Sequence, residues 1–82
     1  MTYYVYILEC ADKTLYTGYT TDLDRRVIAH NTAKTAAKYT KVRRPVRLLY
    51  SEAFETKSEA LKRECAIKKI PREEKLVLVG LR

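Results

Sequence analysis

The sequence has few residues of the types that stabilise small proteins through disulfides or zinc: two cysteines and one histidine among 82 residues. Cys10 and Cys65 form no CxxC pair, so neither a disulfide framework nor a zinc cluster is available. We therefore expect a reducing, cytoplasmic setting, with both thiols as small core residues. No apolar run approaches the ~20 residues that cross a bilayer, and the N-terminus has no secretory pattern. Membrane insertion and secretion are not expected.

Acidic residues are also scarce compared with basic ones. Ten Asp and Glu against 17 Lys and Arg give a net charge of +7 and a pI of about 9.6. The hydrophobic (46%) and charged (33%) fractions are those of a globular protein, and the length suits one domain, residues 1–82, expected to be monomeric. A basic excess in so small a chain favours a polyanionic partner, with nucleic acid as the first candidate, although many small soluble proteins are basic without binding one.

Tyrosine and β-branched residues concentrate at the start of the chain. Residues 2–10 and 14–20 have strand composition, and the three residues between them suit a hairpin loop. The first strand is apolar on both alternating faces, as in a strand covered on both sides, so we place it at the centre of a sheet. Residues 31–41 are small and basic without clean periodicity, which predicts a loop or a frayed helix end, and residues 46–54 return to strand composition.

Two threonine-led capping patterns predict helix starts. Thr21 with Asp24 opens a helix over residues 22–31, and Thr56 with Glu59 opens one of about a dozen residues. Pro71 suits the first position of a last helix, which the glycine at position 80 ends. The order β-β-α-β-α-α predicts an α+β fold with a three-stranded, mainly antiparallel sheet flanked by helices.

The first predicted helix carries polar residues close to its buried face. Leu23 and Val27 define the buried direction, whereas Arg25 points nearly the opposite way, to solvent. Arg26 and His30, four residues apart, lie at the border of the packed face. An arginine stem covering apolar surface and a half-buried histidine bonded to backbone would explain them, and a pair of site residues is the alternative.

Glu64 falls in the middle of the apolar face of the second predicted helix, beside Cys65. Removing an ionised carboxylate from water is costly unless a charge or a metal compensates. An ion pair with Lys68 is the simpler explanation, but an exposed helix pair contributes only about 0.3–0.5 kcal/mol and would hardly justify the position. We therefore favour a functional role for Glu64.

Seven tyrosines accompany one phenylalanine and no tryptophan. Each buried tyrosine needs a partner for its hydroxyl, which a core built for packing alone would avoid. If Cys10 pairs with Thr14 across the hairpin, Tyr6 lies opposite Gly18, and the glycine lets a ligand approach. The same register brings Tyr16 diagonally onto the face that carries Tyr6.

These residues, taken in order, resemble the motifs of the GIY-YIG nuclease superfamily: Tyr4-Val5-Tyr6, Tyr16-Thr17-Gly18, Arg26, His30 and Ala60-Leu61-x-x-Glu64. Each triplet alone is a weak signal, but their order and spacing together are specific. The resemblance covers nearly the whole chain and is strongest to the small stand-alone bacterial members. The superfamily also includes the N-terminal cutting domain of the UvrC excision-repair protein.

The resemblance implies a site that cuts nucleic acid, with its residues converging on one concave surface. Tyr16 would be the general base or a partner of the attacking water, with Tyr6 beside it. Arg26 would hold the scissile phosphate, and His30 would assist proton transfer or orient the water. Glu64 would be the ligand to a single Mg²⁺ or Mn²⁺. A carboxylate suits a hard divalent ion, and a guanidinium binds phosphate oxygens in pairs.

The chain departs from the family pattern at Tyr4, Thr17 and Tyr19, which leaves room for an altered substrate or weakened activity. The leading hypothesis is a metal-dependent DNA endonuclease of repair or recombination. The alternatives are a non-catalytic nucleic-acid-binding module and a partner domain for a separate repair or RNA factor. We expect a basic stretch to contact the phosphate backbone, with its tyrosine stacking on a base; a solvated loop is the alternative. The stretch comprises Lys34, Lys38, Tyr39, Lys41, Arg43 and Arg44.

Overall fold

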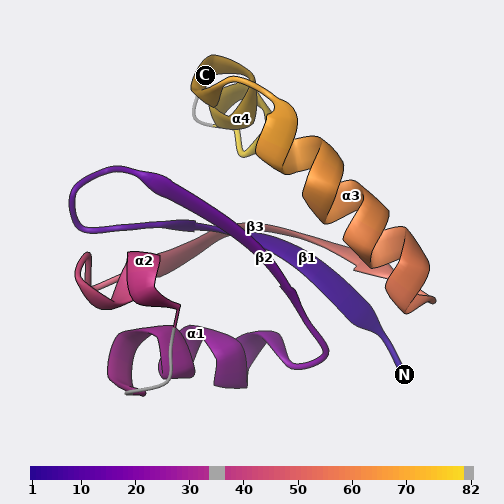
Figure 1. Ribbon diagram of the computed structural model, residues 1–82, viewed down its shortest axis with the longest axis horizontal. Helices are drawn as coiled ribbons and strands as arrows, with labels where there is room; N and C mark the ends of the chain where they lie inside the picture. Colours follow the sequence, from indigo (N-terminus) through magenta and orange to yellow (C-terminus); the bar gives the residue numbers. More distant parts are fainter. Residues whose placement is uncertain (34–36, 81–82) are drawn as a thin grey trace.

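Three antiparallel strands form a sheet in the order β2-β1-β3. The computed structural model describes residues 1–33 and 37–80, with the elements β1 (Tyr3–Glu9), β2 (Leu15–Thr20), α1 (Leu23–Thr32), α2 (Lys38–Lys41), β3 (Arg47–Phe54), α3 (Lys57–Lys69) and α4 (Arg72–Leu78). The predicted α+β fold and the central position of the first strand are confirmed. Figure 1 shows α1 and α2 on one side of the sheet and α3 and α4 on the other.

Strand β1 contributes to a separate core on each face of the sheet. Val5 and Ile7 pack with Ala60 and Ile67 of α3, and all four side chains are fully buried. The alternate residues of β1, among them Tyr6, face the other way and pack with partly buried side chains of α1. Because successive side chains of a strand point to opposite faces, one central strand can serve both layers.

The two capping patterns mark real helix starts, but one is displaced. Thr56 caps α3 by accepting a hydrogen bond from the Glu59 amide, as expected. Helix α1 is capped by Asp22 and not by Thr21: the Asp22 carboxylate accepts from the Arg25 amide at 3.1 Å. The cause is Thr20, the last residue of β2. Its hydroxyl accepts a hydrogen bond from the Asp22 amide, and this turn moves the helix start one residue beyond the predicted cap.

The end of α1 is tied to the start of β3 by side chains. Asn31 accepts a hydrogen bond from the Val46 amide at 2.7 Å and donates to the Val46 carbonyl at 3.0 Å. The Arg44 guanidinium donates to the carbonyls of His30 and Ala33. These carbonyls lie in the last turn of the helix, where no intrahelical donor remains, and a basic side chain suits them. The last turn of α1 is therefore fixed in place.

Three expectations are corrected on the helices. Cys65 is exposed, because the inward stripe of α3 follows i, i+3, i+4, i+7 through Ala60, Glu64 and Ile67 and leaves Cys65 outside; Cys10 is buried as expected. Pro71 is the N-cap of α4 and not its first residue, so the helix begins one residue later than predicted, at Arg72. The segment predicted as a loop includes the short helix α2. In the part of the chain that the structure describes, no helix is long and apolar enough to span a membrane.

Candidate active site

Tyr6 lies across the backbone of the edge strand β2 at Gly18. The two residues are partners in the confirmed hairpin register, and a Cβ on Gly18 would lie 2.5 Å from the Tyr6 hydroxyl oxygen. A residue with any side chain would displace the phenol. The Tyr16 ring, on the same face, has its centroid 6.5 Å from that of Tyr6. The rings of Tyr6 and Tyr16 thus lie close together beside Gly18, which has no side chain to displace them.

A chain of hydrogen bonds runs from Arg26 into the protein interior. The Arg26 Nε–H donates to the Tyr6 hydroxyl at 3.3 Å, and that hydroxyl is 2.8 Å from His30 Nε2. On its other side, His30 Nδ1 is 2.8 Å from the Thr40 hydroxyl. Thr40 in turn donates to the Ala37 carbonyl at 3.0 Å. The chain joins β1, α1 and α2 within one buried cluster.

Only one assignment of protons satisfies every member of this chain. Because the Thr40 hydroxyl donates to a carbonyl, it accepts from His30, whose proton must then be on Nδ1. Nε2 is left as an acceptor and receives the Tyr6 O–H. Tyr6 is therefore held as a neutral phenol that donates to His30 and accepts from Arg26.

The surroundings shift the pKa values in agreement with this assignment. Burial, helped by the charges of Arg26 and Arg44, lowers the pKa of His30 from 6.5 to about 4, so His30 is neutral at pH 7. Burial also raises the pKa of Tyr6, although Arg26 acts in the opposite direction. The bond to Tyr6 raises the pKa of Arg26, which keeps its charge. The site at neutral pH is a neutral imidazole and a phenol beside a fixed cation.

Tyr16 is held by an aromatic stack that continues into α2. Its ring is 5.2 Å from the His30 ring in an edge arrangement and stacks on Tyr39 at 5.9 Å between centroids. The Arg43 guanidinium lies 4.0 Å above the Tyr39 ring and pairs with Asp12 of the hairpin loop at 3.0 Å. Tyr39 and Arg43, expected at the nucleic acid, are thus engaged in packing beside Tyr16.

Glu64 approaches from α3, the helix on the opposite face of the sheet. Its side chain is 17% exposed and its carboxylate is 3.6 Å from the Lys68 ammonium, the pairing considered from the sequence. Its negative charge contributes, as one of the smaller causes, to the raised pKa of Tyr6. Glu64 is therefore electrostatically coupled to the tyrosine site, and its position on the same concave surface stays a prediction.

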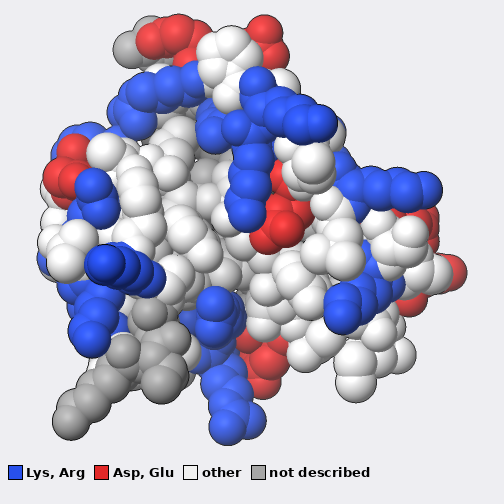
Figure 2. All heavy atoms as spheres, viewed as in Figure 1, with Lys and Arg blue, Asp and Glu red and all other residues white. Residues whose placement is uncertain are grey.

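The described residues of the basic stretch differ in their contacts. Lys34 lies outside the described residues. Lys38 and Lys41 are exposed on α2, whereas Arg44 binds the end of α1 and Arg43 pairs with Asp12. On the face shown in Figure 2, Lys and Arg side chains surround a central region of uncharged surface. Positive charge is thus spread around this face.

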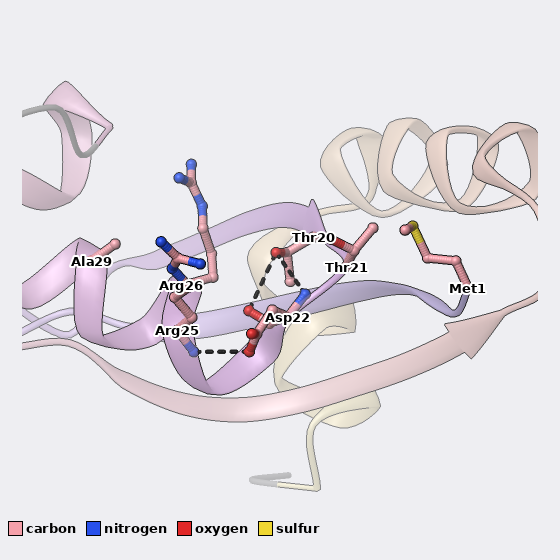
Figure 3. Close-up of a pocket in the computed structure, with 7 residues that line it drawn as sticks. All are labelled: Met1, Thr20, Thr21, Asp22, Arg25, Arg26 and Ala29. Atoms are coloured by element: carbon pink, nitrogen blue, oxygen red, sulfur yellow. Dashed lines mark hydrogen bonds between the residues drawn. The ribbon is translucent and has the colours of Figure 1, made fainter.

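Sequence reasoning missed three residues of the site. Thr40 orients His30 and Asp12 holds Arg43, and both depend on contacts between segments that no local pattern predicts. Arg25 is exposed, as expected, and it also lines a pocket of about 460 Å³ together with Arg26 (Figure 3). Two adjacent arginines in a predicted helix start were the available signal for this pocket.

Comparison with known proteins identifies the relatives. The family model described as the GIY-YIG catalytic domain matches residues 2–76. The chain is 56% identical over 78 residues to the UPF0213 protein SSP2268 of Staphylococcus saprophyticus, covering 95% of this chain and 94% of that protein. It is 57% identical over 76 residues to the UPF0213 protein SAG0778 of Streptococcus agalactiae, covering 93% and 85%. The solution NMR structure of the UPF0213 protein BH0048 from Bacillus halodurans is also similar, with 50% identity, a TM-score of 0.63 and coverage of 100% of this chain and 86% of that one.

Proposed function

The chain belongs to the GIY-YIG family, and we propose that it is a metal-dependent endonuclease-like domain that hydrolyses DNA phosphodiester bonds. The observation that carries the proposal is the gathering of Tyr6, Tyr16, Arg26 and His30 from three elements into one hydrogen-bonded aromatic cluster. A core built only for packing would not bring two phenols, an imidazole and a guanidinium together.

The two tyrosines differ in how their hydroxyls are used. The Tyr6 hydroxyl is committed to His30 and Arg26. The half-buried Tyr16 is held by ring contacts, and no hydrogen bond commits its hydroxyl within the described part of the chain. We therefore assign Tyr16 as the general base or the partner of the attacking water. His30 acts through Tyr6, since both of its ring nitrogens are occupied.

Arg26 is the proposed contact to the scissile phosphate. Its Nε–H bonds to Tyr6, which orients the guanidinium, while the side chain also lines the surface pocket shown in Figure 3. A guanidinium can bind phosphate oxygens in pairs and stabilises charge that builds on them in the transition state. The same residue thus connects the buried cluster to the nucleic acid.

Glu64 is the proposed ligand to one Mg²⁺ or Mn²⁺. The described residues contain no group of three or more His, Cys, Asp or Glu that could hold a metal by themselves. A single carboxylate still fits, because Mg²⁺ commonly keeps several waters and binds through one or two carboxylates plus substrate phosphates. When bound, the ion would polarise a phosphoryl oxygen and stabilise the developing charge.

A non-catalytic nucleic-acid-binding module is the second candidate. The Glu64–Lys68 pair favours it, because a carboxylate that only neutralises a lysine has no need of a metal. In that case the basic surface would bind the phosphate backbone without cutting it.

Two matched variants separate these candidates, since both break the same ion pair. Glu64→Gln should lose Mg²⁺-dependent cleavage by at least about 100-fold, whereas Lys68→Gln should keep it. Both should melt close to the wild type, because an i,i+4 helix pair whose lysine is half exposed contributes only about 0.3–0.5 kcal/mol. In EDTA, Glu64→Gln should bind DNA as well as wild type or better. Equal cleavage by all three proteins would refute the role of Glu64 and indicate a contaminating nuclease.

The wider setting is proposed on the same basis. We propose that residues 1–82 form a single monomeric domain acting in the cytoplasm, and both cysteines are free, as in a reducing compartment. The resemblance to the UvrC cutting domain suggests repair or recombination intermediates as substrates.

A further inference from the structure

We propose that the pocket beside Arg26 is a binding subsite for a backbone phosphate next to the one that is cut, with Arg25 as its main contact. The pocket has a volume of about 460 Å³ and is lined by Thr20, Thr21, Arg25 and Arg26, among others. Its size lies within the range of pockets that hold small ligands. The inference rests on the proposed function and names a further contact to the same substrate.

Arg26 belongs to both the active-site cluster and the pocket. Its Nε–H donates to the Tyr6 hydroxyl, and its side chain lines the pocket wall. A second depression of about 360 Å³ is lined by Tyr19, Thr20, Thr21 and Arg26, so the two share one wall along the edge of β2. A strand of nucleic acid whose scissile phosphate lies at Arg26 would continue along this shared edge.

Arg25 is available for such a contact. Its backbone amide is hydrogen bonded to Asp22, and its exposed guanidinium makes no hydrogen bond or ion pair to another described residue. Figure 3 shows Arg25 and Arg26 side by side at the start of α1, both reaching away from the Asp22 carboxylate. Two neighbouring guanidinium groups suit successive phosphates of one strand, because each phosphodiester carries one negative charge.

Among the described residues that line the pocket, Asp22 is the only acidic one. Its carboxylate caps α1 by accepting from the Arg25 amide, which explains its presence. Two arginines against one aspartate leave the pocket with a net positive charge at neutral pH. Asp22 therefore weakens phosphate binding without preventing it, and this gives the proposal a second, opposite test.

The first test measures binding without cutting. Affinity for a duplex oligonucleotide is measured in EDTA as a function of salt for the wild type, Arg25→Gln and Arg72→Gln. Arg72 is an exposed arginine on α4, in the other layer of the fold, so it controls for the loss of one charge. Arg25→Gln should bind roughly tenfold more weakly and reduce the slope of log K against log salt by about 0.9, the value for one phosphate contact. Equal losses in both variants would overturn the subsite.

The second test locates the phosphate. Neutral methylphosphonates replace the phosphates of the oligonucleotide one at a time. In the wild type, a methylphosphonate at one position next to the phosphate bound by Arg26 should weaken binding. In Arg25→Gln, the methylphosphonate at that position should cause no further loss of affinity. Asp22→Asn keeps a good helix cap and should bind several-fold more tightly. Additive losses, or weaker binding by Asp22→Asn, would overturn the proposal. Because no cleavage is measured, failure of the nuclease assignment would appear separately, as absent Mg²⁺-dependent cutting by the wild type.

Discussion

Replacing Gly18 by alanine tests the geometry on which the site depends. The backbone at Gly18 is not left-handed, so alanine adds no backbone strain, and the new methyl would lie 2.5 Å from the Tyr6 hydroxyl oxygen and 2.8 Å from its Cζ. Since an ordinary contact begins at 3.4 Å, the hydroxyl must move by about 0.9 Å (3.4 − 2.5). That displacement breaks the 2.8 Å bond to His30 and leaves the buried Nε2 without a donor.

The cost follows from these two effects. Overpacking a fitted core costs about 1–3 kcal/mol, and an unsatisfied buried acceptor costs about 1–3 kcal/mol. A total near 3 kcal/mol would lower the melting temperature of a domain of this size by about 12–24 °C. Cleavage should be lost as well, because Tyr6 no longer orients Arg26.

Thermal unfolding followed by circular dichroism gives the measurement, and a double-mutant cycle identifies the cause. Tyr6→Phe removes the nearest atom, so Gly18→Ala should cost at least about 1 kcal/mol less in that background than in the wild type. A Gly18→Ala protein that melts within about 2 °C of the wild type would show that Tyr6 does not lie over Gly18, and the site as described would be wrong.

Two further predictions concern the histidine and the aromatic stack. The pKa of His30 is about 4 in the folded protein against 6.5 ordinarily, so between these pH values His30 gains a proton only in the unfolded chain. The free energy of unfolding should therefore fall by about 3 kcal/mol as the pH drops from 6.5 to 4. His30→Gln should remove that pH dependence from denaturant titrations between pH 6.5 and 4.5. Asp12→Asn releases Arg43 and loosens the stack of Tyr39 on Tyr16, so the cleavage rate should fall roughly tenfold. Glu9→Gln breaks the pair with Arg47 and removes the same charge, so it is the control. DNA affinity should change alike in both variants, and an equal loss of cleavage would argue against a positioning role.

Local patterns in the sequence were sufficient for the strands and for the first members of the site. Closing the hairpin at Cys10 and Thr14 predicts the register that places Tyr6 over Gly18, and helical geometry places Arg26 and His30 near the buried face. His30 is more deeply buried than expected, because α2 covers it. The Asp22 cap could not be distinguished from Thr21 by sequence, since both are good caps and a side chain of the preceding strand decides between them.

Contacts between distant segments could not be predicted. The roles of Thr40, Tyr39 and Arg43 depend on where α2 lies against the hairpin, and a run of small and basic residues does not encode that position. The basic composition suggested a partner surface, which stays a prediction, and the structure adds that half-buried Arg43 and Arg44 also make contacts within the protein. Long-range packing thus turns residues that look solvated into supports of the site.

Strand β1 has a consequence for how this family can evolve. Val5 and Ile7 face α3, and Tyr6, between them, faces the opposite layer, where it belongs to the candidate site. The strand therefore has no neutral side on which mutations can accumulate. A slip of one residue would exchange the two sets completely. We expect a saturation-mutagenesis map of β1 to show loss of folding at Val5, Ile7 and Leu8 and loss of both stability and activity at Tyr6, and β1 to drift most slowly among homologous chains.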